Sequence, residues 1–259
     1  MTKSCAVPLS RGDLSVSTRQ NELDEIFDVV SSASEVPKQT RKQFWKLVRQ
    51  IKREVNPDIS EVKKATQIRN ILFEMDRGKT YSIGPFVAAQ TLLGILAFVL
   101  YLHALNTPVS WLDFLSWGLP EIIAVFLRFL GIFLMIAFFY PYGRLIAGTV
   151  LGIRLEAMGF SKYKEPALKI DYETFLLATP SRRKWFFFFS GLWTMITAVG
   201  TGLIGWYIAG DILGFIIGVF FIGFYGYVIG TGVTYPNRGE MSQYNREKKI
   251  ERAWKKKVD

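Results

Sequence analysis

Residues 186–210 read FFFFSGLWTMITAVGTGLIGWYIAG and contain no Lys, Arg, Asp or Glu. A helix needs about 20 apolar residues to cross the hydrocarbon core of a bilayer, so this stretch is long enough to span a membrane. Outward from it, Asp211 is the only charged residue between positions 186 and 235, and residues 84–105 are also uncharged. Half of the 259 residues are hydrophobic and only 21% are charged. These runs predict an all-α, polytopic integral membrane protein and argue against a chain made only of soluble domains.

Four transmembrane helices are predicted, at about residues 84–105, 122–142, 186–208 and 211–233. The second apolar region is longer than one span needs, because it continues to residue 155. It is either a span followed by an interfacial helix or one long kinked helix. Pro141, which lacks an amide donor, marks the expected kink or end.

The net charge alternates in sign along the chain. Lys and Arg exceed Asp and Glu by four in each of three segments, residues 1–80, 141–185 and 236–259. The two segments between them, 81–140 and 186–235, each have a net charge of −1, and the total is +10. Because Lys and Arg stay on the cytoplasmic side, this pattern predicts that both termini are cytoplasmic. We expect the cell membrane or another membrane that faces the cytoplasm. Since the charge pattern is a topology signal, we expect no nucleic-acid partner.

The segments outside the membrane domain differ in character. Residues 1–36 are polar and are predicted to be a flexible tail, apart from a short acidic stretch at 22–30 that places apolar side chains on one helical face. Residues 37–80 contain two apolar stripes at helical spacing, separated by Asn56-Pro57-Asp58, and are predicted to form a cytosolic amphipathic helical hairpin. Residues 81–235 form the membrane domain, and residues 236–259 a basic cytoplasmic tail.

Residues 140–144, Tyr-Pro-Tyr-Gly-Arg, end one apolar stretch and begin another, and residues 152–156, a basic loop and residues 190–195 follow. This order resembles a degenerate form of the membrane core of site-2 proteases, over about residues 129–205. In that family one helix carries His-Glu-x-x-His and a later helix opens near Gly-Pro-x-x-Asn. The resemblance implies a helical membrane fold.

The residues that carry the chemistry of that family are replaced in this chain. The replacements are Tyr140 for the first zinc-binding His, Pro141 for the catalytic Glu, Arg144 for the second His, and Leu192 and Met195 for the later Pro and Asn. Zinc-water chemistry needs metal ligands and a base. The resemblance therefore implies a catalytically inactive relative without a metal site. Cys5 and His103 are also the only residues of their types, and we expect no cofactor.

Two arginines, Arg128 and Arg144, are candidate intramembrane charge sites. An Arg within an apolar span is costly unless it is paired or reaches water. Arg128 could bind an anion or pair with Glu121, seven residues earlier on the same face. The interpretation we favour is that it extends toward the outer interface.

Two sets of residues are candidates for packing and for lipid contact. Glycines at four-residue steps predict a groove for close helix packing in the last span, most simply against the preceding one: Gly210, Gly214, Gly218, Gly226 and Gly230. The second set is the cations of a basic loop at about 156–184. They are predicted to contact anionic lipid headgroups, or only to keep the loop on the cytoplasmic side of the membrane. These residues are Lys162, Lys164, Arg182, Arg183 and Lys184.

These features favour a non-catalytic, membrane-anchored binding or scaffold protein. Its cytosolic helices or basic tail would contact a protein partner or the membrane lipids. One alternative is a small transporter or channel subunit that uses Arg128, although the spans offer few other polar groups. A second is a lipid-modifying enzyme, although no ionisable groups converge on a recognisable pocket.

Overall fold

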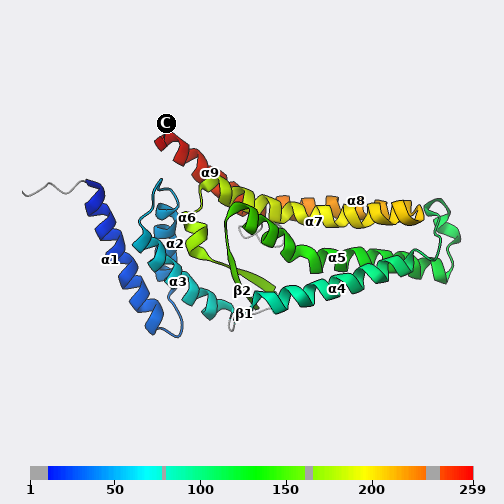
Figure 1. Cartoon of the computed structure of the whole chain (residues 1–259), viewed down its shortest axis with the longest axis horizontal. Helices are drawn as coiled ribbons and strands as arrows, with labels where there is room; N and C mark the ends of the chain where they lie inside the picture. Colours follow the sequence, from blue (N-terminus) through cyan, green and yellow to red (C-terminus); the bar gives the residue numbers. More distant parts are fainter. Residues whose placement is uncertain (1–10, 78–79, 161–165, 232–239, 259) are drawn as a thin grey trace, which may run out of the picture.

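A computed structural model describes residues 11–77, 80–160, 166–231 and 240–258. The molecule is elongated, with long helices side by side at one end and a group of helices and strands at the other (Figure 1). Among these described residues, three helices are long and apolar enough to cross a membrane, namely α4 (Ile83–Ala104), α5 (Leu119–Leu151) and α7 (Pro180–Ala209). The predicted all-α integral membrane fold is confirmed. A fourth apolar helix, α8 (Ile212–Thr231), lies along α7, and its role as a fourth span stays a prediction.

The second apolar region is one continuous helix. Pro141 lies inside α5, so the long-helix alternative is the one observed. At one end of the long helices, which we call the far end, the 3-10 helix η1 (Trp111–Ser116) connects α4 to α5. A tight turn at the same end connects α7 to α8. Gly210 closes α7 there with a φ of 64°, a left-handed conformation that favours glycine.

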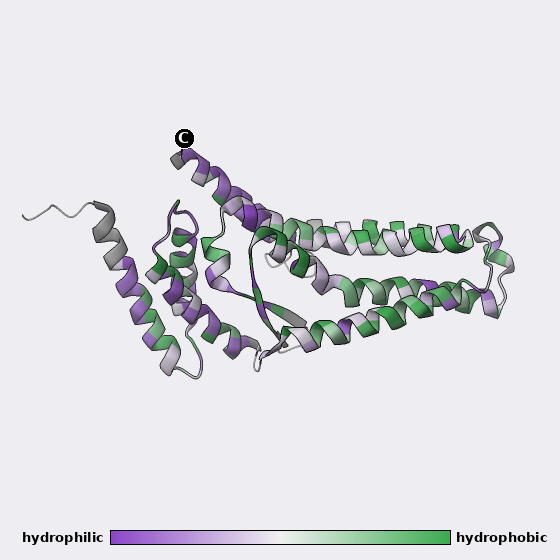
Figure 2. Cartoon of the chain, viewed as in Figure 1, coloured by the Kyte–Doolittle hydropathy of each residue, from purple (hydrophilic) through white to green (hydrophobic). Residues whose placement is uncertain are grey.

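At the other end lies a helical unit that we call the head. It consists of α1 (Arg11–Ser32), α2 (Lys38–Ile51), α3 (Ile59–Arg77) and α6 (Tyr172–Leu177). Hydropathy separates the two parts, since the long helices are mostly apolar and the helices of the head are mixed (Figure 2). The two helices predicted within residues 37–80 correspond to α2 and α3. Phe44, Leu47 and Ile51 of α2 are buried, as the three- and four-residue spacing predicts.

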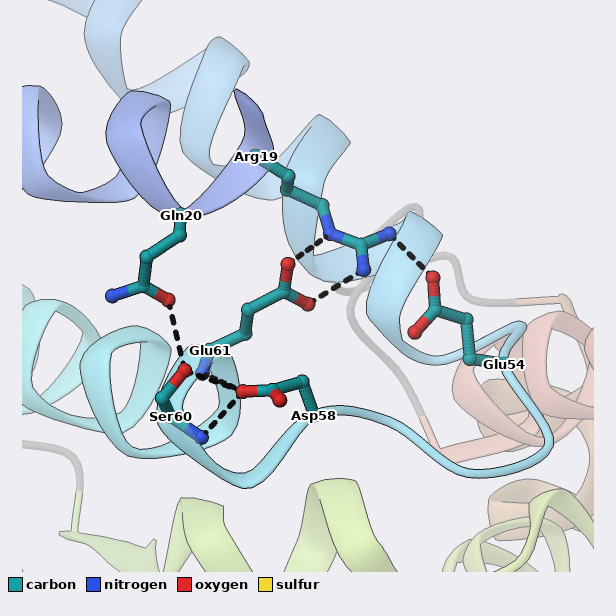
Figure 3. A network of polar contacts seen from close by, with 6 residues as sticks. All are labelled: Arg19, Gln20, Glu54, Asp58, Ser60 and Glu61. Carbon is teal, nitrogen blue, oxygen red and sulfur yellow. Dashed lines mark hydrogen bonds and ion pairs between the residues drawn. The ribbon is translucent and has the colours of Figure 1, made fainter. Parts of the chain in front are cut away.

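Residues 11–32 form helix α1, so the prediction of a flexible tail is wrong for residues 11–21. The stretch 22–30, whose apolar side chains were expected on one helical face, does lie in a helix. Leu23, Ile26 and Val30 are almost completely buried within the head. A charged contact adds to this packing, because Arg19 binds the buried Glu61 and also Glu54 (Figure 3). Three apolar side chains on one face, with one buried ion pair, order a helix that its polar composition disfavours.

The segment predicted as the basic loop 156–184 contains regular structure. Strands β2 (Leu155–Phe160) and β3 (Pro166–Ile170) form an antiparallel hairpin, followed by α6 and the first turn of α7. A third strand, β1 (Thr80–Ser82), pairs with β2, with Thr80 opposite Gly159 and Ser82 opposite Ala157. This sheet joins the segment before α4 to the segment after α5.

Candidate functional site

The C-terminal helix α9 (Glu240–Val258) lies against the beginning of α7 and the head (Figure 1). Its contact is made by three carboxylates that face cations and polar groups of the rest of the chain. We call this contact the charged seam, and its members are Glu240, Glu247 and Glu251 of α9 with Lys52, Tyr140, Arg144, Arg183, Lys184 and Ser190.

The centre of the seam is Glu247, which is held by two cations. Arg183 Nε donates to Glu247 Oε2 over 2.7 Å, and Lys52 Nζ donates to Glu247 Oε1 over 2.6 Å. The Arg183 and Glu247 side chains are only 2% and 1% exposed. The other guanidinium nitrogens of Arg183 donate to the carbonyl oxygens of Leu176, Ala178 and Lys52. One buried group therefore joins α9, α7 and the head.

The electrostatics of this centre follow from its burial and its charges. Burial by itself would raise the pKa of the Glu247 carboxyl, but the charges of Lys52 and Arg183 and their hydrogen bonds outweigh it, and the pKa is lowered. For Lys52, burial is the largest effect and lowers the pKa of the ammonium, although Glu247 opposes this. Because Glu247 is stabilised as a carboxylate, we treat it as an ionised partner of both cations.

A second part of the seam lies where α5 and α7 meet α9. Tyr140 Oη donates to Glu240 Oε1 over 2.8 Å, and Ser190 Oγ donates to the same oxygen over 3.4 Å. The guanidinium of Arg144 binds that oxygen through Nε, at 3.2 Å, and also through Nη2. Glu240 is thus the counterion of Arg144, which was predicted as an intramembrane charge site.

The third contact pairs Lys184 Nζ with Glu251 Oε2 at 2.6 Å. The three carboxylates share one face of α9, because seven residues separate Glu240 from Glu247 and four separate Glu247 from Glu251. This spacing was the signal in the sequence that could have indicated the seam. Residues 236–259 were predicted to be a basic tail from their net positive charge alone.

The seam changes the interpretation of the cations predicted to contact lipid headgroups. Arg183 is buried within an ion pair, so its prediction as a headgroup contact is wrong. The Lys184 side chain is largely buried and forms an ion pair with Glu251, so it is also engaged within the protein. Arg182 is exposed, as the prediction requires. Lys162 and Lys164 lie outside the described residues.

Arg128 has a different partner from those predicted. Its Nε donates to Asp211 Oδ2 over 3.1 Å, and its Nη2 donates to the Thr107 carbonyl oxygen over 2.9 Å. Thr107 and Asp211 both lie in the connections at the far end, so the side chain extends toward that end but is only 1% exposed. Glu121 instead accepts from the Gly118 amide at the start of α5. The interpretation of Arg128 as paired with Glu121 is therefore wrong, and the group it binds is the carboxylate of Asp211.

The predicted glycine groove divides into positions with different neighbours. A methyl group at Gly218 would lie 2.8 Å from the Ala198 carbonyl oxygen of α7, and one at Gly214 would lie 2.6 Å from Asp211 Oδ2. A methyl group at Gly226 would make only ordinary contact with Met195. Gly210 serves the turn described above, and the surroundings of Gly230 lie outside the described side chains. The close approach of α8 to α7 is thus at Gly218, whereas a methyl group at Gly214 would meet Asp211 and the Tyr101 side chain of α4.

Within the described part of the chain, no three His, Cys, Asp or Glu side chains come together as metal ligands would. Tyr140 and Arg144, which occupy the zinc-ligand positions of the site-2 protease pattern, bind a carboxylate instead. No protein-family model, curated protein or solved structure matches the chain.

Proposed function

We propose that this protein is a non-catalytic, membrane-anchored scaffold whose head lies in the cytoplasm and binds a soluble acidic partner. Both termini are cytoplasmic in this proposal, and α8 is a fourth span. A non-proteolytic relationship to site-2 proteases is part of the same proposal. This relationship is supported by the contacts of Tyr140 and Arg144, which both bind the Glu240 carboxylate. These two positions therefore hold α9 in place.

The observation that carries the proposal is the exposed face of α2. Its cations lie on the side of the helix opposite the buried Phe44, Leu47 and Ile51, because they recur at three- and four-residue steps. They are Lys38, Lys42, Lys46 and Arg49, with Arg53 just after the helix. The segment from 36 to 53 has no Asp or Glu, and Trp45 beside the cations is 42% exposed. Such a face attracts an acidic surface.

The position of α2 favours a soluble partner over the adjacent membrane. The packed side of α2 contacts α6, since Phe44, Leu47 and Ile51 belong to the same buried cluster as Tyr172, Phe175 and Leu176 of α6. In Figure 1, α6 lies between α2 and the long helices. The basic face is on the other side of α2, directed away from α6.

The test uses the full chain in nanodiscs and a 20-residue polyglutamate peptide as the acidic probe. We expect the triple variant Lys42→Gln, Lys46→Gln, Arg49→Gln to weaken binding at least tenfold, because each exposed cation contributes to long-range attraction. The matched control neutralises three exposed cations of α9: Arg246→Gln, Lys249→Gln and Arg252→Gln.

Equal loss of peptide binding in both variants would mean nonspecific charge attraction. Tighter binding of an oligonucleotide than of the peptide would overturn the choice of partner. Ion flux or lipid turnover by reconstituted wild-type protein would overturn the scaffold assignment.

A further inference from the structure

Helix α9 carries opposite charges on its two sides. The carboxylates of one side are held in the charged seam. The exposed cations that lie away from that side are Arg246, Lys249, Arg252 and Lys256. Lys255 is also exposed, but its Nζ lies 3.8 Å from Glu251 Oε1. Because the seam neutralises the carboxylates with cations of α7, α5 and the head, the exterior of α9 is strongly positive.

The beginning of α9 lies where an apolar helix meets its polar surroundings. Glu240 contacts α5 and α7 inside two helices that are long enough to span the membrane. One turn later, Tyr244 packs against Trp185 and Phe188 of α7, at ring-centre distances of 6.4 and 5.7 Å. Trp185 is 37% exposed. Trp and Tyr concentrate at the headgroup level of membrane proteins, so this aromatic cluster indicates the boundary of the bilayer at the head end.

We infer that α9 binds anionic phospholipid headgroups in the leaflet on the head side. The acidic side of the helix is fixed to the protein and the aromatic cluster sets its level, so the exposed cations overlook the lipid surface beside α7. The lipid contact expected of the loop 156–184 is thereby assigned to a different segment. This inference goes beyond the proposed scaffold function and does not depend on the basic face of α2.

The cations of α9 have the chemistry that this ligand needs. Lys and Arg close to an anionic leaflet are attracted to it, and each contributes about a fivefold increase in affinity. Lys248 Nζ lies 5.8 Å from the Tyr244 ring centre, which adds positive charge at the level of the aromatic cluster. A zwitterionic surface offers no net charge to these groups, so phosphatidylglycerol should be enriched beside α9 relative to phosphatidylcholine.

The experiment measures local lipid enrichment around the full chain. A donor dye is attached at Ala253→Cys in a Cys5→Ser background, at an exposed position between the cations. The protein is placed in mixed phosphatidylcholine and phosphatidylglycerol nanodiscs, where one lipid at a time carries an acyl-chain acceptor. Energy transfer to each acceptor gives the preference for the anionic lipid.

We expect the wild-type background to prefer the anionic lipid. The variant Lys249→Gln, Arg252→Gln, Lys255→Gln, Lys256→Gln should reduce the preference for the anionic lipid by about tenfold or more. The control Lys38→Gln, Lys42→Gln, Lys46→Gln, Arg49→Gln on α2 should change it less than about twofold. In 1 M salt the wild-type preference should also fall, because the screening length is then about 3 Å. No preference in the wild type, or equal losses in the two variants, would overturn the inference. Melting temperatures in pure phosphatidylcholine confirm that both variants are folded.

Discussion

Arg183 and Glu247 are 64 positions apart, yet their side chains form a 2.7 Å ion pair that is almost fully buried. The pair joins the first turn of α7 to the C-terminal helix, and Lys52 joins the head to the same carboxylate. A buried ion pair costs desolvation when it forms, so its presence does not by itself make a protein more stable. Removing one partner is different, because the remaining charges stay buried without compensation.

Glu247→Gln should therefore destabilise the protein strongly. The neutral amide leaves Arg183 and Lys52 without their counterion, and we expect a loss of about 3–5 kcal/mol in unfolding free energy. Denaturant unfolding in detergent measures it. Arg246→Gln, on the exposed side of the same helix, is the control and should change the free energy by less than about 0.5 kcal/mol. Equal effects of the two substitutions would show that the pair is unimportant.

The same carboxylate predicts how stability depends on pH. Since the folded pKa of Glu247 is below its ordinary value of 4.5, the contribution of its charge is complete above pH 4.5. The contribution is lost as the pH falls through the lower, folded value. The difference in melting temperature between wild type and Glu247→Gln should thus be constant near neutral pH and shrink in acid. A difference that stays the same from pH 7 to pH 3 would contradict this.

At the far end, Arg128→Leu should be costly because it leaves Asp211 buried without its counterion. We expect a loss of about 3–5 kcal/mol. The double variant Arg128→Leu, Asp211→Asn should recover part of the loss, since neither charge remains. Thermal unfolding in detergent compares both with Glu121→Gln, which removes only a helix cap worth about 1 kcal/mol. If Arg128→Leu costs no more than this control, the ion pair does not stabilise the fold.

Gly218→Ala tests the close approach of α8 to α7. The added methyl would meet the Ala198 carbonyl oxygen, which belongs to the backbone and cannot rotate away. We expect a destabilisation of about 1–3 kcal/mol from overpacking. Gly223→Ala is the matched control on the same helix, because a methyl there has open space around it. Similar melting temperatures for the two variants would count against a packed groove.

Labelling with a membrane-impermeant maleimide tests the topology. Single cysteines in a Cys5→Ser background at Asp113 and Ile208, both exposed at the far end, should react from outside the cell. Cysteines at Ser60 and Lys249, exposed at the head end, should react only after permeabilisation. Asp211 is unsuitable for labelling because it is 8% exposed. Protection of residue 113 in intact cells would reverse the proposed orientation.

The features predicted correctly from the sequence are those that depend on neighbours along the chain. The uncharged residues 186–210 identified a membrane helix, and the spacing of Phe44, Leu47 and Ile51 identified α2. Features that depend on distant partners were missed. Seven-residue spacing suggested Glu121 as the partner of Arg128, whereas Asp211, 83 positions away, is the partner found. Strands β1, β2 and β3 have too few residues to show a clear two-residue alternation.

The sheet has a mechanical consequence for the molecule. Ser82 is the last residue of β1 and Ile83 is the first residue of α4, so no hinge residue separates the strand from the helix. Because β1 is hydrogen-bonded to β2, we expect a change in the tilt of α4 to rotate the sheet or to strain its pairing. Long helices adjust their tilt when the hydrocarbon thickness changes. We therefore expect the angle of α4 in the bilayer to be transmitted to the sheet beside the head, so that the thickness of the host membrane would affect the geometry at the head end.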